Sequence, residues 1–549
     1  NREMPVDLKT ASIVICAWEN PWARAGGLFA VVKEYAGYLR AQQRNVLILT
    51  PMHQLGGCPR NAENETPIQV PFDDQRINAA VRRVSHSGVD WFLLSAASFF
   101  EADGGLTGSS PYAYSGDSSD PEHSRLLRDS LFFSRAVPHA LEALGADNLI
   151  VHLQDWQTAP AAVTIKDHIA AGGPVSAAVV LTMHNPYDHS LSDRTWRQLT
   201  EEPLPADELH TVYRRTLERL DAPPATVSRE FSVDLRNDGL QTLYFANHLQ
   251  PILEQTGIIG VDNGPFEEMR DPFPSGDCLA VKQHSRTRML RLLEEYQQEE
   301  QRVTGWLEGA DGGRLTSLPD TVPFFMMAGR LDPRQKGFDI FVRAIREFLG
   351  PQQHDGRFLL ATEPGDAPPA YVDDLLGLGE EFPGRVLICA FRMQRGYFEC
   401  QAGATFSVWP SFYEPFGGVS EFFLKGTPAV ARQTGGLRQQ VFDVRLSDRG
   451  TGITYDLPGA GSRAEWQAIM DAGSPDSRER EPLYREHIRH LTDALVRAAS
   501  TFQDSDAYDR LLGNLYPVCQ QFSWERVWQE YSEVYQTACC RSQSPAGDR

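Results

Sequence analysis

The sequence predicts an α/β protein of two domains, each built around a parallel β-sheet with helices on both faces. Three observations support this prediction. The chain has 549 residues, more than a single hydrophobic core usually holds. Short, continuously apolar runs alternate with helix-forming segments, as they do in parallel sheets. This alternating series occurs twice, once in each half of the chain, so two sheets are expected.

The first series begins near the N-terminus. Residues 29–42 are expected to form a helix, and the Gly-, Ser- and Pro-rich stretch 104–124 a loop or lid. Ligands of such sheets bind at the carboxyl ends of the strands, and polar loops follow three of these ends. The buried strands of this half are expected at 11–17, 45–50, 149–153 and 177–183.

The second series begins near Pro323. A helix is expected at 338–349, and the polar segment 294–311 is expected to be a surface insertion. Near the C-terminus, 522–535 carries a Ser N-cap followed by aromatic residues at helical spacing, which predicts a last helix. The strands of this half are expected at 323–329, 358–362, 385–391, 406–409 and 428–432.

These elements define the expected domain organisation. We expect an N-terminal domain over 1–252 and a C-terminal domain over 253–520, with the boundary and a hinge near 250–257. A helix over 521–540 and a flexible tail over 541–549 are expected to follow.

Composition narrows the class of partner. The net charge of −21 argues against nucleic acid or an anionic membrane surface, so any anion site must be built from local Arg, Lys and backbone amides. No apolar run reaches the roughly 18 residues that span a membrane, and no secretory signal opens the chain. The eight cysteines form no CxxC pair, as expected of buried thiols in a reducing compartment. We therefore expect a cytoplasmic protein of undetermined oligomeric state.

The stretch from Trp409 to Leu437 carries the clearest functional pattern. Glu414 lies on a loop after an apolar strand, and Gly417-Gly418 allow close backbone approach before a helix expected at 419–424. The free N–H groups and partial positive charge of a helix start suit a phosphate. A carboxylate beside them can hold sugar hydroxyls. The pattern therefore indicates a sugar nucleotide.

A second glycine pair lies near the N-terminus. Gly26-Gly27 follows a strand and opens a helix, which is a geometry that can cradle a diphosphate, and Arg24 can add a fixed positive charge. A plain strand-to-helix turn explains this loop equally well, because short glycine motifs recur by chance.

Two cations follow the first strand of the second series. Arg330 and Lys336 can stabilise the charge that develops on a leaving pyrophosphate. Taken alone, two solvated surface cations would be the commoner explanation.

Polar residues also close two strands of the first half. His184 follows the strand at 177–183 and can contact a sugar or a reacting centre, although a lone His is more often structural. Asp155 occupies the equivalent position after the preceding strand, where helix N-capping is the alternative.

Together these motifs resemble those of the GT-B glycosyltransferases, and within them the bacterial glycogen/starch synthase group. The similarity follows the order of the family's motifs along nearly the whole chain. The matching segments are WENPWARAGGL (18–28), HLQDWQTAP (152–160), LTMHN (181–185), TVSREF (226–231), VDNGPFEE (261–268), GRLDPRQKG (329–337), PSFYEPFGG (410–418), RQTGGL (432–437) and FSWERVWQEY (522–531).

The resemblance implies two Rossmann-like domains that face an interdomain cleft. It also implies retaining transfer of glucose from a nucleoside-diphosphate sugar to the non-reducing end of an α-1,4-glucan. ADP-glucose is the expected donor, with UDP-glucose as the alternative. A different sugar donor, or a small-molecule or cell-surface glycan acceptor, stays open. No cofactor or metal is expected, because Arg, Lys and helix dipoles take the place of a cation.

The resemblance also assigns roles to individual residues, with Arg330 and Lys336 holding the diphosphate and Glu414 contacting the sugar. The predicted catalytic residues are His184, Arg330, Lys336 and Glu414. The predicted donor-binding residues are Arg24, Gly26, Gly27, Asn263, Gly417, Gly418, Val419, Glu421, Thr434, Gly435 and Gly436. Sugar or acceptor contacts are predicted for Glu19, Asp155 and Asn185.

The chain departs from the family pattern at several positions. Arg24 stands in place of the loop lysine, Ala30 in place of an acidic residue, and Gln157 in place of the second His of the HDWH-type motif. Glu421 follows Glu414 one residue earlier than the usual paired-Glu spacing, a shift of about 100° on a helix. These departures concern recognition of donor and acceptor more than the type of reaction.

Two other classes of function remain as alternatives. A sugar-nucleotide epimerase or hydrolase on this scaffold would need further acid/base groups, which the sequence does not show. A sugar-binding relic without activity would be expected to lose some of the four predicted catalytic residues, all of which are present.

Overall fold

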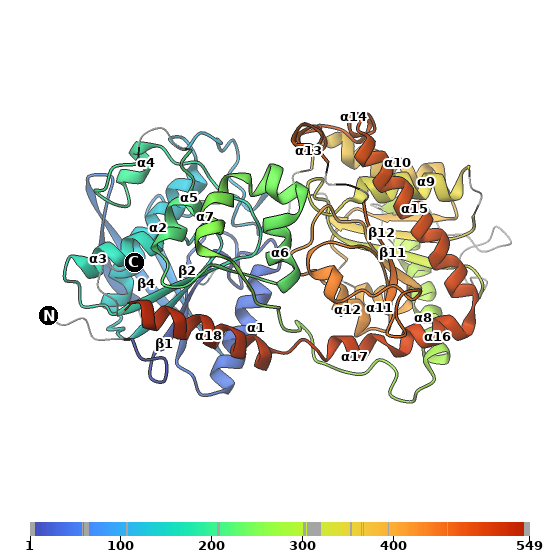
Figure 1. Cartoon of the computed structure of the whole chain (residues 1–549), viewed down its shortest axis with the longest axis horizontal. Helices are drawn as coiled ribbons and strands as arrows, with labels where there is room; N and C mark the ends of the chain where they lie inside the picture. The colour runs from blue at the N-terminus through green and yellow to red at the C-terminus, as the bar shows by residue number, and fades with distance from the viewer. Residues whose placement is uncertain are drawn as a thin grey trace. The chain divides into compact units, whose positions relative to one another are not determined.

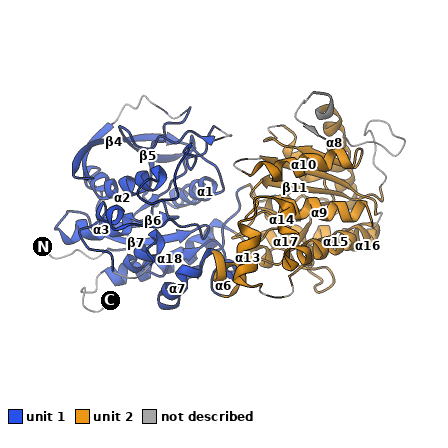
Figure 2. Cartoon of the chain, turned by 90° about the horizontal axis from the view of Figure 1, so that it is seen from above, with its two compact units in different colours: residues 1–236, 245–266, 523–549 blue, residues 237–244, 267–522 orange. Residues whose placement is uncertain are grey.

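The chain forms two compact units, shown as a ribbon in Figure 1 and in separate colours in Figure 2. Unit 1 comprises 1–236, 245–266 and 523–549, and unit 2 comprises 237–244 and 267–522. The computed structural model describes residues 6–542 apart from 58, 60–64, 106–107, 206–208, 300–302, 305–319, 352–353, 364, 366, 394, 458 and 460.

The unit limits differ in position from the expected domain limits. The chain changes unit at 266/267 and at 522/523, whereas the expected limits were 252/253 and 520/521. The segment expected to act as a hinge, 250–257, lies inside unit 1, where most of it forms helix α7.

Unit 1 is built around a nine-stranded sheet in the order β3-β4-β5-β2-β1-β6-β7-β8-β9. From β5 to β9 neighbouring strands are parallel, and Ile13 of β1 pairs with both Val46 of β2 and Ile150 of β6. The strands are β1 (Ser12–Cys16), β2 (Val46–Pro51), β3 (Glu65–Phe72), β4 (Gln75–His86), β5 (Val89–Ala96), β6 (Leu149–Gln154), β7 (Ala177–Met183), β8 (Ala225–Thr226) and β9 (Ile259–Gly260).

The antiparallel edge formed by β3, β4 and β5 is absent from the expected fold. Two-residue turns join these strands, Asp73-Asp74 and Ser87-Gly88, and all four turn residues have positive φ. Such turns match the twist of a hairpin. β3 alternates exposed and buried residues instead of forming a continuous apolar run, so a search for buried parallel strands passes over it.

Helices cover the sheet of unit 1. Ser124 caps α2 by accepting a hydrogen bond from the Leu127 amide at 3.1 Å. The helices are α1 (Leu28–Ala41), α2 (Arg125–Ala143), α3 (Ala161–Ala170), α4 (Asp193–Arg197), α5 (Val212–Thr216), α6 (Arg229–Asn237), α7 (Gln250–Thr256) and α18 (Trp524–Ser542), with short 3₁₀ helices at Leu217–Arg219 and Asn247–Leu249. A π-helix at Gln241–Phe245 belongs, except for Phe245, to unit 2.

The last helix, α18, packs in the core of unit 1. Ser523 caps it by accepting from the Arg526 amide at 3.2 Å. Tyr535 Oη lies 2.9 Å from His152 Nδ1 on β6, and Tyr531 Oη lies 2.8 Å from Thr182 Oγ1 on β7. These buried hydrogen bonds fix the orientation of α18 on the sheet, because an unpaired polar group there would be costly.

Unit 2 contains a seven-stranded sheet in the order β10-β13-β12-β11-β14-β15-β16, parallel except for β10. Phe325 of β11 pairs with Phe358 of β12 and with Phe406 of β14, and these three rings stack in the core. The strands are β10 (Val303–Thr304), β11 (Phe324–Arg330), β12 (Arg357–Glu363), β13 (Val386–Cys389), β14 (Phe406–Trp409), β15 (Ala429–Arg432) and β16 (Gly452–Tyr455).

The helices of unit 2 lie between and after these strands. The segment 294–311 ends α8, includes β10 and otherwise lies outside the described residues. The tail 541–549 lies outside them from 543 on. The helices are α8 (Cys278–Glu299), α9 (Phe338–Leu349), α10 (Pro369–Glu381), α11 (Tyr397–Gly403), α12 (Val419–Phe423), α13 (Arg463–Met470), α14 (Pro475–Arg478), α15 (Pro482–Gln503), α16 (Ser505–Gly513) and α17 (Leu515–Cys519), with a 3₁₀ helix at Gly435–Gln439.

The fold class predicted from the sequence is confirmed: both units are α/β with a parallel sheet, extended in unit 1 by the antiparallel edge. Among the described residues, no helix combines the length and apolar character needed to cross a membrane. All the described cysteines are free thiols, and only Cys540 of them is exposed.

Candidate active site

In both units the parallel sheet reverses its winding direction once. The reversal lies between β1 and β6 in unit 1 and between β11 and β14 in unit 2. Loops that follow the strands on either side of such a point form the crevice where α/β sheets bind ligands. About half of the predicted site residues lie on these four loops, and the others follow neighbouring strands or lie on α12.

An ion pair between Lys336 and Glu414 joins the two loops of unit 2. Lys336 Nζ lies 3.0 Å from Glu414 Oε1 and 2.8 Å from Oε2, and Ser411 Oγ donates to Oε2 at 3.0 Å. The Glu414 side chain is 5% exposed and that of Lys336 is 20% exposed. Because an ammonium group has three donors, Lys336 can bind a phosphate oxygen and still contact Glu414.

Gly337 allows the two loops to lie against each other. Its φ is 72°, and a Cβ at this position would be 2.2 Å from the carbonyl oxygen of Pro410. The Phe412 amide donates to the Gln335 carbonyl at 2.7 Å. A larger residue at 337 would therefore separate the loops that carry Lys336 and Glu414.

Arg330 ends β11, and its side chain is exposed. Within the described part of the chain no ion pair or hydrogen bond involves its guanidinium group. Arg334, one turn further along, pairs instead with Asp471 at 3.0 Å. The charge of Arg330 is therefore available to an anionic ligand at the carboxyl end of the sheet.

The glycine pairs of unit 2 pack around Glu414. Gly417 has φ 87°, and Gly418 is the N-cap residue of α12, a helix of five residues. The Gly436 amide donates to the Glu414 carbonyl at 3.0 Å, and a Cβ on Gly436 would be 2.3 Å from the Phe416 carbonyl oxygen. These contacts hold the Glu414 loop in place. Thr434, Gly435 and Val419, which are also predicted to bind the donor, are buried beside it.

Glu421 lies on α12 in acidic surroundings. Burial raises its pKa to about 7, and the nearby Glu267 adds to this shift. Lys425, which pairs with Glu267, and Lys336 oppose it. The influence of Lys336 indicates that Glu421 lies within electrostatic reach of the Lys336–Glu414 pair, although its predicted role stays a prediction.

In unit 1 the carboxylate of Glu19 occupies the start of α1. Its Oε1 accepts from the Gly26 amide at 3.1 Å and from Tyr112 Oη at 3.1 Å, and its Oε2 accepts from the Phe29 amide at 3.2 Å. Glu19 is 2% exposed. The Glu19 carboxylate thus already accepts hydrogen bonds from amides in the segment that is predicted to cradle a diphosphate. The donor roles of Gly26 and Gly27 stay predictions.

The loop after Gly104 packs against this glycine loop. The Arg24 amide donates to the Ser109 carbonyl at 2.8 Å, and Ser109 Oγ donates to the Arg24 carbonyl at 3.2 Å. The Arg24 guanidinium lies 5.5 Å from the centre of the Phe29 ring, within cation–π range.

Asp155, His184 and Gln154 form the second cluster of unit 1. Asp155 Oδ1 accepts from the His184 amide at 2.6 Å, so the carboxylate fastens the loop after β7 and does not cap α3. Burial, with a contribution from Glu19, raises the pKa of Asp155 to about 7. His184 Nε2 lies 2.7 Å from Gln154 Oε1, and burial lowers the pKa of His184 to about 3. His184 is therefore a neutral hydrogen-bonding group at neutral pH.

The two predicted asparagines have mainly local contacts. Asn185 Oδ1 accepts from the Tyr187 amide at 3.0 Å, which closes a turn after β7. Asn263 lines a cavity of about 10 Å³ together with Gln154, Trp524 and other residues of unit 1. This volume is close to that of a single water site. His184 and Asn185 are consecutive residues on the loop after β7, whereas Asn263 lies against α18.

Sequence reasoning missed several residues of these clusters: Tyr112, Gln154, Ser411, Glu267 and Lys425. Gln154 is the last residue of a buried strand, and Ser411 directly follows Pro410 after β14, so the rule that polar residues at strand ends face a ligand could have found both. Tyr112 and the Glu267–Lys425 pair depend on contacts distant in sequence, for which the chain gives no local signal.

Comparisons with known proteins place these observations in a family context. Residues 12–217 match the family described as the starch synthase catalytic domain. The chain is 25% identical to a glycogen synthase of Koribacter versatilis (strain Ellin345), over 94% of this chain and 96% of that protein. It is 24% identical to glycogen synthase 2 of Agrobacterium fabrum, over 94% and 90% respectively.

Two solved structures share the fold. The catalytic domain of starch synthase IV from Arabidopsis thaliana, solved with ADP and acarbose, gives a TM-score of 0.72 at 20% identity, covering 98% of this chain and 100% of that one. An α,α-trehalose-phosphate synthase (UDP-forming) from Burkholderia vietnamiensis gives 0.53 at 11% identity, covering 97% and 100%. Together with the sequence matches, these likenesses identify the chain as a glycosyltransferase of GT-B fold that is similar to the glycogen and starch synthases.

Proposed function

We propose that this enzyme transfers glucose from a nucleoside-diphosphate donor to the non-reducing end of an α-1,4-glucan, with retention of the anomeric configuration. The observation that carries the proposal is the Lys336–Glu414 pair, with Arg330 nearby in sequence, at the winding reversal of unit 2. This cluster combines the cations that a diphosphate requires with a carboxylate that can accept hydrogen bonds from sugar hydroxyls.

Arg330 and Lys336 act on the leaving group. As the bond between the sugar and the phosphate breaks, negative charge grows on the diphosphate, and fixed cations stabilise it without reorganisation. Arg330 presents a planar fork of donors suited to phosphate oxygens, and Lys336 supplies the donor that Glu414 leaves unused.

Glu414 acts on the sugar. Its side chain is anchored by Lys336 and Ser411, so its orientation is fixed before the substrate binds. A fixed carboxylate can accept hydrogen bonds from sugar hydroxyls and balance the positive charge that develops on the sugar ring. Retention requires that the new bond form on the face of the sugar from which the diphosphate departs.

Unit 1 supplies the polar groups for the transferred sugar and the acceptor. Neutral His184 offers hydrogen bonds without placing a second cation near the sugar, and Asp155 holds the backbone that positions it. We assign no metal or other cofactor to the transfer, because the cations of unit 2 can carry the charge of the diphosphate.

ADP-glucose is the proposed donor and UDP-glucose the alternative. The similarity to glycogen synthases, and to a starch synthase that was solved with ADP, supports this choice. A different acceptor is the second candidate, because Ala30 and Gln157 depart from the family pattern in unit 1, the half to which the acceptor is assigned.

Incubation with labelled ADP-glucose, UDP-glucose and other nucleotide sugars, with and without glycogen or maltooligosaccharides, tests the proposal. Donor consumption that requires a glucan supports it. Consumption without any acceptor would indicate a hydrolase or epimerase, and binding without consumption would indicate a sugar-binding relic. NMR of the first product checks retention through the anomeric configuration of the new linkage.

A further inference from the structure

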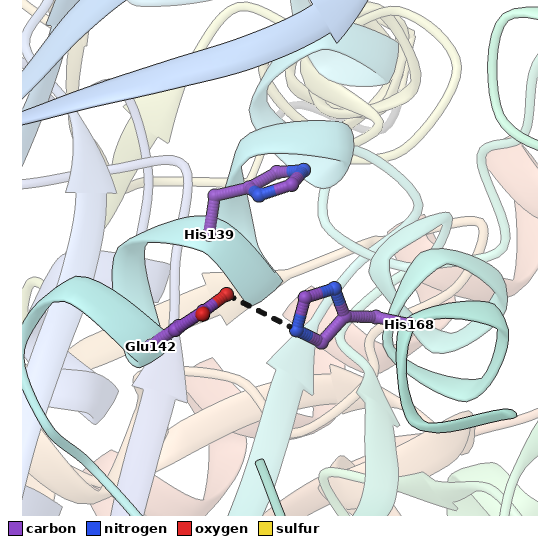
Figure 3. Close-up of side chains that lie close together, drawn as sticks. All are labelled: His139, Glu142 and His168. Atoms are coloured by element: carbon purple, nitrogen blue, oxygen red, sulfur yellow. Dashed lines mark ion pairs between the residues drawn. The ribbon is translucent and has the colours of Figure 1, made fainter. Parts of the chain in front are cut away.

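A cluster of possible metal ligands lies in unit 1, away from the loops described above. His139 and Glu142 are three residues apart on α2, and His168 lies in the last turn of α3 (Figure 3). One ligand atom from each residue lies within 4.8 Å of the other two. His168 Nε2 is 3.4 Å from Glu142 Oε2.

These separations are close to those of a tetrahedral zinc site. With metal–ligand distances of about 2.0–2.1 Å, two ligand atoms of a tetrahedral site lie about 3.3 Å apart. The His168–Glu142 separation already has this value. Glu142 is 45% exposed, so its side chain can rotate toward His139. The rings of His139 and His168, whose centroids are 5.5 Å apart, must also turn to bring their nitrogens closer. The cluster therefore needs side-chain adjustment only.

His168 is fixed in place, and its buried Nε2 makes no hydrogen bond within the part of the chain described, even though Glu142 Oε2 lies 3.4 Å away. The Gly173 amide donates to the His168 carbonyl at 2.9 Å, and a Cβ on Gly173 would be 2.3 Å from the imidazole ring. The turn after α3 thus packs against the His168 imidazole ring. A buried, unsatisfied nitrogen in a polar cluster calls for a partner.

The nearest cations do not compete for the site. Arg135, one turn before His139, donates to the Pro71 carbonyl at 3.2 Å and to the Leu199 carbonyl at 2.8 Å. Lys166, two residues before His168, is paired with Asp221.

The position of the cluster argues against a part in sugar transfer. α2 ends just before β6 begins, and α3 ends just before β7 begins. The cluster therefore lies toward the amino ends of these strands, whereas Asp155 and His184 lie at their carboxyl ends.

We propose that His139, Glu142 and His168 bind a divalent transition-metal ion, Zn²⁺ foremost, which ties α2 to α3. Two imidazole nitrogens and one carboxylate oxygen are ligands that Zn²⁺ prefers, and water completes its four-coordinate shell. The ion has a structural role and takes no part in the transfer reaction.

Calorimetric titration of the full-length, chelator-treated protein with Zn²⁺ tests this inference. We expect one strong site per chain and a melting temperature that rises with the Zn²⁺ concentration. His168→Gln should weaken Zn²⁺ binding by at least about 10–100-fold, the size of effect that even supporting residues of metal sites produce. Co²⁺ should give the intense visible absorption of a tetrahedral site in the wild type and lose it in this variant.

Two further variants keep the test decisive. Glu142→Gln changes an exposed position, so it should fold even if His168→Gln does not, and it should weaken binding at least about tenfold. His490→Gln is the matched control, because His490 Nε2 is also 3.4 Å from a glutamate, Glu486 Oε2, but belongs to no such three-residue cluster among the described residues. His490→Gln should bind Zn²⁺ as the wild type does.

The absence of a strong Zn²⁺ site in the wild type, or Zn²⁺ binding by Glu142→Gln that equals that of the wild type, would overturn the proposal. Donor consumption by metal-free enzyme tests the proposed function separately.

Discussion

The two units have the same strand order around their winding reversals but carry different charged groups there. In unit 1 the flanking loops carry the carboxylates of Glu19 and Asp155, both buried, and the raised pKa of Asp155 reflects in part its proximity to Glu19. In unit 2, β11 ends with Arg330 and the loop after it carries Lys336; among the described residues, Lys336 is paired with a carboxylate and Arg330 is not.

This difference assigns the two halves different ligands. A diphosphate brought close to Glu19 would meet like charge, whereas the cations Arg330 and Lys336 would attract it. Hydroxyl groups suit unit 1, where carboxylates and a neutral His184 provide hydrogen-bonding atoms. The fold alone would not separate the roles, because both sheets offer the same crevice geometry.

The largest effect is expected when the cation and carboxylate of unit 2 are removed. Lys336→Ala and Glu414→Ala should each lower kcat by about 10²-fold or more, because each group acts on charge that develops in the transition state. Steady-state kinetics with the preferred donor and glucan would measure this.

Lys166→Ala is the matched control for the lysine variant. Lys166 is 15% exposed and pairs with Asp221, which is 3% exposed, much as Lys336 pairs with Glu414, but it lies on α3. The Lys166→Ala variant should be less stable than the wild type, with a kcat within a few-fold of the wild-type value. A near-normal kcat in both unit 2 variants would remove the proposed site.

A pH-dependent effect is expected from Glu421. Its folded-state pKa of about 7 lies above the ordinary value of 4.5, so between these values the folded chain binds more protons than the unfolded one. Its stabilising contribution is present below pH 4.5 and is lost as the pH rises through about 7. Glu421→Gln should therefore gain stability relative to the wild type between pH 5 and 8, by up to about 3 kcal/mol.

Thermal unfolding of the wild type and Glu421→Gln across this pH range would measure the difference. Glu380→Gln, at an exposed position of α10, is the control and should show no such trend. A constant offset between Glu421→Gln and the wild type at all pH values would contradict the raised pKa.

The glycine pairs of the two units should respond differently to alanine. A Cβ at Gly436 would be 2.3 Å from the Phe416 carbonyl oxygen, whereas a Cβ at Gly27 would meet no atom within 4 Å. Gly436→Ala should destabilise unit 2 by about 2 kcal/mol or more through backbone displacement, and Gly27→Ala should be close to neutral. Chemical denaturation of both variants would show whether this order holds; the reverse order would be inconsistent with the packing around Glu414.

The smallest effect is expected at Glu19. Glu19→Gln keeps the shape but removes the charge that holds the Gly26 and Phe29 amides, at a cost of about 1 kcal/mol. Hydrogen exchange over the start of α1 should become faster in this variant. Glu34→Gln on the same helix should leave it unchanged, since Glu34 pairs with the neighbouring Lys33 and not with the amides at the start of the helix. Equal exchange in both variants would mean that Glu19 does not hold the loop.

The sequence predicted the parallel sheets well because continuous apolar runs make a strong local signal. The strand at 177–183 and the helix at 338–349 agree with β7 and α9 at both ends. β3 was missed because its residues alternate between buried and exposed, which is typical of an edge exposed on one face. β4 was missed because only three consecutive residues of this long strand are buried.

Of the candidate site, only the residues at or just after the ends of strands could be predicted from the sequence. Arg330, Lys336 and Glu414 could be placed at one end of one sheet, because Arg330 ends a strand and the other two each follow a strand by a few residues. The binding of Glu19 to the α1 amides, and the effect of Glu267 on Glu421, could not be predicted. Both depend on how a side chain folds back over its own loop or meets a distant segment, and no periodicity encodes that.

Calorimetric titration with ADP and with UDP tests the central claim, that unit 2 binds the diphosphate through Arg330 and Lys336, most directly. Arg330→Ala should bind the preferred nucleotide at least about tenfold more weakly than the wild type, as expected when a charged hydrogen-bonding group is lost. Arg334→Ala, which removes a cation already paired with Asp471, should bind it normally. Unchanged affinity in Arg330→Ala and in Lys336→Ala would contradict the account.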